Sequence, residues 1–413
     1  MSIDPDVVVV GAGASGLAAA RALLEAGLTV TVIEAKDRIG GRAVTQTSHG
    51  VAWDRGAHWL HDHKRNYFSR FAETAGIPLQ PVAASRRLWT GDAWADDDLI
   101  RDYNAYCNLA FDRLLTQGLA EEDTPVSDAL PEHFQYRPMF ESLYAALSGM
   151  EPDRSSAFDE YRYREDTGNR RVHIGYGALL ARFGEPVPVS LSTSAQRIDW
   201  SGTGVVVESP AGSLTASAAL VTVSNAVLAQ GRIRFSPGLP PALQQAIEDI
   251  PLGEAEKVAV VFDRNVFGFE EDTNLSFIHT GSRAARFQVR PFGKNIAVAY
   301  MAGRFAREIR AAGTDAMIDF AVAQLVDVFG AGIRSAIVGC EATGWCTDPL
   351  IGGGYSSAPP GKADARLALS VPVAERVFLA GEAHAIDAYG TVHGAYNSGV
   401  ETAAKVIQAL RPA

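Results

Sequence analysis

The chain has 413 residues, of which 47% are hydrophobic and 21% are charged, which excludes a disordered chain and allows more than one hydrophobic core. A formal net charge of -11 argues against nucleic acid as a partner, because phosphate backbones are bound by clusters of lysine and arginine. The three cysteines lack CxxC spacing, so they predict neither a disulfide framework nor a zinc site. Together with the lack of an export signal or a long apolar run, they predict a cytoplasmic protein without a membrane partner.

The first predicted element is a short strand, VVVV at residues 7 to 10, whose composition is typical of a strand buried on both faces of a parallel sheet. The residues after it, GAGASG, place Gly11, Gly13 and Gly16 before an amphipathic helix, and a second strand then ends at Glu34. In such a unit the glycines allow a tight turn, close approach of a pyrophosphate and close helix packing, while the acid accepts hydrogen bonds from a ribose diol. The unit predicts a dinucleotide site and leaves open whether the dinucleotide is FAD or NAD.

The next segment, KDRIGGRAVT at residues 36 to 45, resembles the FAD-dependent amine oxidase family and its flavoprotein relatives. The resemblance implies FAD as the cofactor, with Gly41 and Arg42 beside it and Arg42 near its phosphate and ribityl portion. Bidentate binding of an anion suits the guanidinium of an arginine. The same segment adds Arg38 to the expected cofactor-binding residues, the alternative for Arg38 being a surface charge.

DRGAHWLHDH at residues 54 to 63 resembles another segment of this family, and the resemblance implies that His61 borders the substrate channel. No acid or cysteine pattern accompanies the histidines here, so we expect no metal site. Between residues 89 and 170 the resemblance fails. This stretch has amphipathic helical patterns, and we expect it to form a helical cap that shapes the substrate entrance.

The middle of the chain follows the family order again. HIGYGALLARF at residues 173 to 183 resembles the segment that returns the chain to the cofactor domain, and the backbone near Ala195 would flank the adenine. An alternating apolar pattern at residues 252 to 267 predicts a strand that begins near Lys257. A lysine there is costly without a partner or a cavity. The resemblance implies that Lys257 holds a water against flavin N5, the alternative being a side chain that reaches solvent.

GWCTDPLIGGGYSSAPPGK at residues 344 to 362 resembles the stretch that lines the substrate side of the flavin. Tyr355 matches a tyrosine that forms one wall of an aromatic cage, and Trp345 matches a tryptophan near the flavin; packing alone is the alternative for both. The residue at which monoamine oxidases attach FAD through a cysteine is Gly354 here. We therefore expect noncovalent FAD.

RVFLAGEAHAIDAYGTVHGAYNSGVETAAKVIQAL, at residues 376 to 410, predicts a strand, a turn and a final helix, and it resembles the C-terminal signature of the same family. Glu382 would hydrogen-bond the ribityl chain, and the backbone of Val392 would meet the pyrimidine edge of the flavin. The second cage wall falls at Thr391, where monoamine oxidases present tyrosine, and Tyr389 is a possible substitute. His384 departs from the family pattern and has no assigned role.

These motifs predict an α/β and α+β fold. A discontinuous, Rossmann-like FAD-binding domain would comprise residues 1–80, 171–245 and 366–413. Residues 81–170 and 246–365 would form a substrate-binding domain with a mixed sheet and helices.

The resemblance implies an enzyme that oxidises an amine to an imine by hydride transfer to FAD N5, with O2 as acceptor, H2O2 as product and hydrolysis of the imine to follow. Three alternatives stay open: a related flavoenzyme that dehydrogenates carbon–carbon bonds, an L-amino-acid oxidase and a noncatalytic flavin-binding scaffold. An L-amino-acid oxidase would need an arginine clamp for the carboxylate, and the sequence patterns identify none.

Overall fold

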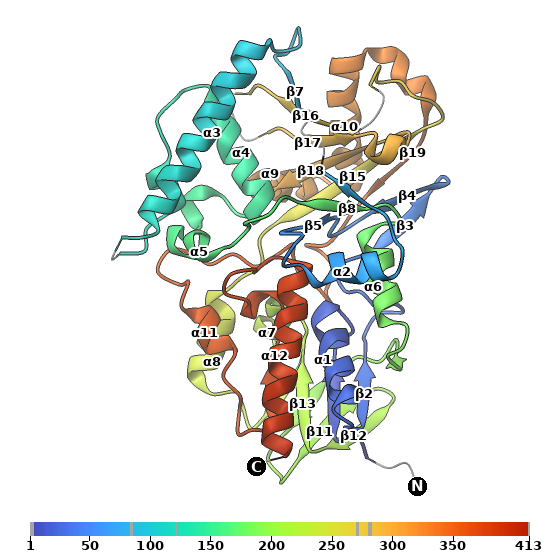
Figure 1. The fold of residues 1–413 in the computed structure, drawn as a ribbon, viewed down its shortest axis with the longest axis vertical. Coiled ribbons are helices and arrows are strands. Elements are labelled where there is room, and N and C mark those ends of the chain that lie inside the picture. Colours follow the sequence, from blue (N-terminus) through green and yellow to red (C-terminus); the bar gives the residue numbers. More distant parts are fainter. Residues whose placement is uncertain (1–3, 83–85, 121, 270–271, 280–282, 412–413) are drawn as a thin grey trace.

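The computed structural model of the protein describes residues 4–82, 86–120, 122–269, 272–279 and 283–411. Figure 1 shows two stacked halves, a lower half built on a parallel sheet and an upper half built on a larger mixed sheet. The predicted fold class is confirmed. The domain boundaries given above stay a prediction. Within the described residues, no helix combines the length and the apolar character that crossing a bilayer requires.

The lower half contains a five-stranded sheet in which every neighbouring pair is parallel. Its strands, in order across the sheet, are β20 (Val377–Leu379), β13 (Ala218–Val221), β1 (Val7–Val10), β2 (Val30–Ile33) and β9 (Val189–Ser190). Val7 and Val9 face a core that includes α1 (Ala14–Glu25) and α12 (Val392–Leu410). Val8 and Val10 face a second core on the other side, so the expectation of a strand buried on both faces is confirmed.

The two ends of the described chain meet where α1 and α12 lie side by side, the blue and red helices of Figure 1. Gly399 makes this contact possible, because a β-carbon there would overlap the carbonyl oxygen of Ser15 in α1. Gly16 has a different role, since a β-carbon there would overlap the carbonyl oxygen of Gly11 in the turn before α1. The small residues of the last helix therefore serve its close approach to the first helix.

The second core of the lower half lies between the parallel sheet and a smaller four-stranded sheet with three short helices. The smaller sheet consists of β12 (Gly212–Ala216), β11 (Val205–Ser209), β10 (Arg197–Asp199) and β14 (Arg234–Ser236), and the helices are α7 (Asn225–Ala229), α8 (Pro241–Asp249) and α11 (Ala365–Leu369). β11 and β12 form an antiparallel hairpin.

The upper half is built on a six-stranded sheet. One face is apolar, and the opposite face combines polar side chains with a small apolar cluster around Trp53. The strands of the sheet, in order, are β19 (Ile337–Ala342), β15 (Ala255–Phe262), β18 (Ile296–Ala302), β17 (Arg286–Val289), β16 (Thr273–Phe277) and β7 (Arg86–Trp89). The apolar face packs against α9 (Gly303–Ala311) and α10 (Thr314–Phe329). Side chains on the opposite face, among them Lys257 and Tyr300, line a cavity.

Helices fill the stretch in which the family resemblance fails, as expected. They are α3 (Asp97–Gln117), α4 (Tyr136–Ser148) and α5 (Ala157–Arg162), and they have their own apolar core. The remaining elements connect the halves: β3 (Thr45–Ser48) with β4 (Val51–Asp54), β5 (Trp59–Leu60) with β8 (Arg170–Val172) and β6 (Leu79–Pro81), α2 (Tyr67–Thr74) and α6 (Tyr176–Gly184).

Candidate active site

A cavity of about 1360 Å³ runs from the carboxyl ends of β1 and β2 to the face of the six-stranded sheet that includes Lys257 and Tyr300. Most of the residues predicted from the sequence line it. They are Gly11, Gly13, Glu34, Gly41, Arg42, His61, Ala195, Lys257, Trp345, Tyr355, Glu382, Tyr389, Thr391 and Val392. Gly16 and Arg38 do not line it. Gly16 lies in α1 and packs against the turn at Gly11.

One end of the cavity is shaped for a pyrophosphate. Gly11 has a φ of 104°, which favours glycine. Gly13 directly precedes α1, which has neither a side-chain cap nor an acid in its first turn. The free N–H groups of that turn are therefore available to an anion. Gly41 lies directly beside Gly13, since a β-carbon on Gly41 would lie 3.4 Å from the α-carbon of Gly13. Both glycines line the cavity, so its wall carries no side chains at these two positions.

Glu34 follows directly after β2, one residue beyond the end of the strand. Its two carboxylate oxygens accept hydrogen bonds from the N–H groups of Ala12 and Lys36, both at 2.8 Å. Each oxygen has a second lone pair, so the carboxylate can still accept the two hydroxyls of a ribose. Ala195 lies just before β10 rather than inside a strand, and it is buried at the cavity wall.

Arg38 supports the glycine turn from outside the cavity. Its guanidinium donates hydrogen bonds to the carbonyl oxygens of Ile39, at 3.2 Å, and Gly41, at 3.0 Å. Burial lowers the pKa of Arg38, and Glu34 acts in the opposite direction. The structure therefore does not bring this predicted cofactor-binding residue to the cavity.

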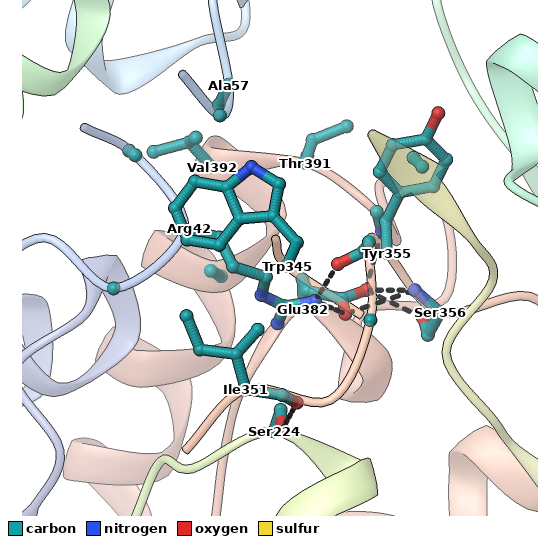
Figure 2. Close-up of a pocket in the computed structure, with 18 of the residues that line it drawn as sticks. Arg42, Ala57, Ser224, Trp345, Ile351, Tyr355, Ser356, Glu382, Thr391 and Val392 are labelled. Carbon is teal, nitrogen blue, oxygen red and sulfur yellow. Dashed lines mark hydrogen bonds and ion pairs between the residues drawn. The ribbon is translucent and has the colours of Figure 1, made fainter. Parts of the chain in front are cut away.

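Arg42 and Glu382 come from opposite ends of the sequence and form an ion pair of 2.9 Å at the middle of the cavity (Figure 2). Glu382 also accepts hydrogen bonds from the hydroxyl of Ser356, at 2.6 Å, and from the N–H of Gly390, at 2.8 Å. Burial alone would raise the pKa of Glu382, but Arg42 and Ser356 lower it overall. This carboxylate fixes three chain segments, and its predicted ribityl hydrogen bond stays a prediction.

Lys257 lies in β15 and does not reach solvent, since its side chain is buried against the cavity wall. Its Nζ donates to the carbonyl oxygens of Asp54, at 3.1 Å, and Gly56, and it lies 3.2 Å from Nδ1 of His58. Burial lowers the pKa of Lys257 to about 7, and Asp54 acts in the opposite direction. These three acceptors match the three hydrogens of an ammonium group, so the expected water would have to displace one of them.

His58 is a residue that the sequence reasoning missed. Its Nε2 lies 3.0 Å from the hydroxyl of Tyr300, so the ring bridges Lys257 and Tyr300. Burial and then the charge of Lys257 lower the pKa of His58, which keeps the ring neutral. The nearest signal in the sequence is its place in DRGAHWLHDH, but the partners lie about 200 residues away.

The three expected cage residues all line the cavity, and each of them also makes a structural contact. Thr391 caps α12, because its hydroxyl accepts the N–H of Gly394 at 2.9 Å. Tyr389 lies beneath the buried guanidinium of Arg366, 4.0 Å from ring centroid to carbon. The hydroxyl of Tyr355 donates to the carbonyl oxygen of Ala146 at 2.5 Å, which fixes the ring against α4.

Trp345 and His61 complete the set of expected substrate-side residues. The indole N–H of Trp345 donates to the carbonyl oxygen of Arg55 at 3.0 Å, and Figure 2 shows the ring between Arg42 and Tyr355. His61 pairs through Nδ1 with Glu165 at 3.0 Å. His384, for which no role was assigned, is buried, and burial lowers its pKa to about 4, so it is a neutral side chain.

Within the described part of the chain, no group of histidine, cysteine and acidic side chains could hold a metal ion. The three cysteines are free thiols, and none of them lines the cavity.

Comparison with known proteins gives a consistent result. Residues 14–407 match the family described as flavin containing amine oxidoreductase. Polyamine oxidase 4 of Oryza sativa subsp. japonica is 28% identical over 432 residues, which cover 97% of this chain and 88% of the relative. Lysine-specific histone demethylase 2 of Homo sapiens is 27% identical over 98% of this chain but only 53% of its own length.

Solved structures share the fold. Cyclohexylamine oxidase from Brevibacterium oxydans IH-35A has a TM-score of 0.81 and 22% identity, with 99% of this chain and 100% of that chain covered. A double mutant of putrescine oxidase has a TM-score of 0.80 and 21% identity, with 98% and 99% covered.

Proposed function

The chain belongs to the family of flavin-containing amine oxidoreductases, and we propose that it is an oxidase that converts a small amine to an imine and passes the electrons to O2 as H2O2. Hydrolysis of the imine then gives an aldehyde or ketone and the free amine or ammonia. The observation that carries this proposal is the single cavity that joins the Gly13–Glu34 end to Lys257 and Tyr355.

The residues present suit FAD. The glycine backbone at Gly11, Gly13 and Gly41 and the uncapped start of α1 would hold the pyrophosphate, and Glu34 would hold the ribose. Arg42, Glu382 and the first turn of α12 would surround the rest of the cofactor. When bound, the flavin supplies the oxidation itself by accepting a hydride equivalent from the carbon next to nitrogen.

The protein's own residues would orient the amine and control protons around it. Tyr355, Trp345 and Thr391 would form the walls beside the reacting amine, and the free N–H groups at the start of α12 would stabilise negative charge. Lys257 has a pKa of about 7, so it can exchange a proton near neutral pH. His58 and the two carbonyl oxygens fix the position of its Nζ.

The test is to mix the purified yellow protein anaerobically with a broad panel of amines and follow bleaching of the flavin, then admit air and measure H2O2 and carbonyl product. We expect bleaching by at least one amine and one equivalent of H2O2 per turnover. A protein that no amine bleaches would instead be a flavin-binding scaffold. Bleaching by an amine-free substrate would identify a carbon–carbon dehydrogenase.

A further inference from the structure

Two arginines lie on the cavity face of the six-stranded sheet. In the strand register, Lys257 pairs with Tyr300 and Tyr300 pairs with Arg286. Residues directly opposite each other share a face of a sheet, so Arg286 lies on the same face as Lys257. Arg86 pairs with Asn274, which pairs with Gln288, two residues along β17 from Arg286. Arg86 and Arg286 both line the cavity.

Neither arginine has an acidic partner in the described part of the chain. Ion pairs at the cavity join Lys36 to Asp348, Arg42 to Glu382 and His61 to Glu165, and none of the ion pairs there includes Arg86 or Arg286.

Three more carboxylates line the cavity. Glu34 accepts the N–H groups of Ala12 and Lys36, and Glu256 accepts the hydroxyl of Thr343 and the N–H groups of Trp345 and Cys346. Glu160 accepts the hydroxyl of Tyr144 at 2.7 Å. Burial raises the pKa of Glu160 to about 7, which weakens it as a counter-charge near neutral pH. Two half-buried cations therefore face the cavity, and neither forms an ion pair with a carboxylate among the described residues.

Both guanidinium groups extend toward α3, away from the parallel sheet. Arg86 donates to the side-chain oxygen of Asn104 at 2.8 Å, and Arg286 lies beside the hydroxyl of Tyr103. Burial raises the pKa of the Cys107 thiol, and the charges of both arginines act against that rise, so both lie near the same turn of α3. Arg86 has five N–H donors, of which the hydrogen bond to Asn104 uses one. Donors remain for a ligand.

We propose that Arg86 and Arg286 form an anion subsite that binds a carboxylate at the far end of the amine substrate. This inference rests on the proposed amine oxidation and names its substrate class. Arg286 lies two strands from Lys257, roughly 10 Å between α-carbons at the usual strand spacing. The carboxylate is therefore separated from the oxidised C–N bond by several carbons, as in an ω-amino acid. A diamine would place a second ammonium against two cations.

The experiment compares three straight-chain substrates of matched length on the FAD-loaded enzyme: ω-amino carboxylates, alkylamines and diamines, each from about four to eight heavy atoms. We expect kcat/KM to be highest for an amino carboxylate, at least tenfold above the matched alkylamine, which corresponds to about 1.4 kcal/mol. A wild-type preference for the diamine would overturn the proposal without use of any variant.

The variants Arg86→Gln and Arg286→Gln should each lower kcat/KM for the amino carboxylate at least tenfold, mainly through KM, and change the alkylamine less than threefold. Arg86→Lys and Arg286→Lys keep the charge and should recover part of the loss. The control is Arg87→Gln, because Arg87 is the neighbour of Arg86 in β7 but stacks over Trp94 and Phe269 and does not line the cavity. Equal losses for both substrates would show that the arginines only support α3.

A second measurement tests anion binding at the two arginines without turnover. Alkanoates without an amine should perturb the absorbance spectrum of the oxidised flavin or show heat in a calorimetric titration, and Arg286→Gln should weaken their binding at least tenfold. If no amine bleaches the flavin, the proposed oxidation has failed, and alkanoate binding still decides whether the two arginines hold an anion. Alkanoate affinity that is unchanged in both glutamine variants would reject the subsite.

Discussion

Asp159 and Arg366 form a buried ion pair with two parallel hydrogen bonds, both of 2.8 Å. The side chains are 3% and 0% exposed. The third nitrogen of Arg366 donates to the hydroxyl of Ser356, at 2.8 Å, and to the carbonyl oxygen of Ala383, at 2.9 Å. Because Ser356 in turn donates to Glu382, the pair joins the helical cap to the carboxylate at the middle of the cavity.

Replacing Arg366 with methionine should destabilise the protein by about 3 to 5 kcal/mol, because Asp159 would remain buried without a counter-charge. Urea unfolding followed by circular dichroism measures this loss. The control is Arg101→Met, which breaks an ion pair with Asp98 whose side chains are 67% and 77% exposed. That change should cost less than about 1 kcal/mol. Similar losses of stability in the two variants would mean that the buried ion pair stabilises the protein no more than the exposed pair does.

The lowered pKa of Lys257 predicts how the stability of the protein depends on pH. Its folded pKa of about 7 is depressed from 10.5, so its contribution to stability is complete above pH 10.5 and falls as the pH drops toward 7. Relative to wild type, Lys257→Met should therefore gain stability as the pH falls from about 10 to 7, with little further change below. Thermal unfolding of both proteins across this range measures the difference. A stability difference between the two proteins that does not change with pH would contradict a buried lysine with a lowered pKa.

The same variant tests the proposed role of Lys257 in the reaction. Lys257→Met should keep FAD but slow either flavin reduction or reoxidation, and it should remove a pH step near 7 from the affected rate. Stopped-flow absorbance separates the two half-reactions. Lys362→Met is the control, since Lys362 pairs with Asp249 at the surface. Unchanged rates in both half-reactions would remove Lys257 from the mechanism.

The contact between α1 and α12 predicts a strong effect at Gly399. Gly399→Val would force a side chain into the carbonyl oxygen of Ser15. The substitution should lower the free energy of unfolding by about 2 kcal/mol or more. It should also weaken FAD retention, because Ser15 lies in the first turn of α1 at the cavity. Gly202→Val is a matched control, as nothing lies within 4 Å of the added carbon. Gel filtration with the ratio of flavin to protein absorbance reports retention, and full retention in Gly399→Val would show that the helices can separate without loss of the site.

We predict that the flavin is bound noncovalently. A β-carbon at Gly354 would lie 2.9 Å from that of Ala255, and no cysteine of the chain lines the cavity. Acid precipitation should therefore release all the flavin to the supernatant. Yellow colour or flavin fluorescence that stays with the denatured protein would show a covalent bond to another side chain.

The parts that could be predicted from the sequence are those encoded locally. Strand, glycine turn, helix and acid follow one another within residues 7 to 34, so their pattern alone indicates the dinucleotide unit. The triad of Lys257, His58 and Tyr300 could not be found in this way, because its hydrogen bonds join residues 199 and 242 positions apart. The pairing of strands decides that contact.

The orientation of Arg86 is a second feature that could not be predicted from the sequence. Its strand reads RRLW, and the sequence does not say whether Arg86 or Arg87 faces the cavity, because a shift of one residue exchanges the two faces. Only the register with β16 settles the orientation. The absence of an arginine clamp from the motifs thus reflected unknown strand pairing rather than a lack of arginines at the cavity.

The contact between α1 and α12 also affects the synthesis of the chain. On a ribosome that adds about 5 to 20 residues per second, α12 emerges roughly 20 to 80 s after α1. During that time the apolar side of α1 lacks its permanent neighbour. The dinucleotide site is therefore expected to be completed only after elongation has passed α12, and cofactor supply is expected to limit the yield of mature enzyme only from that point.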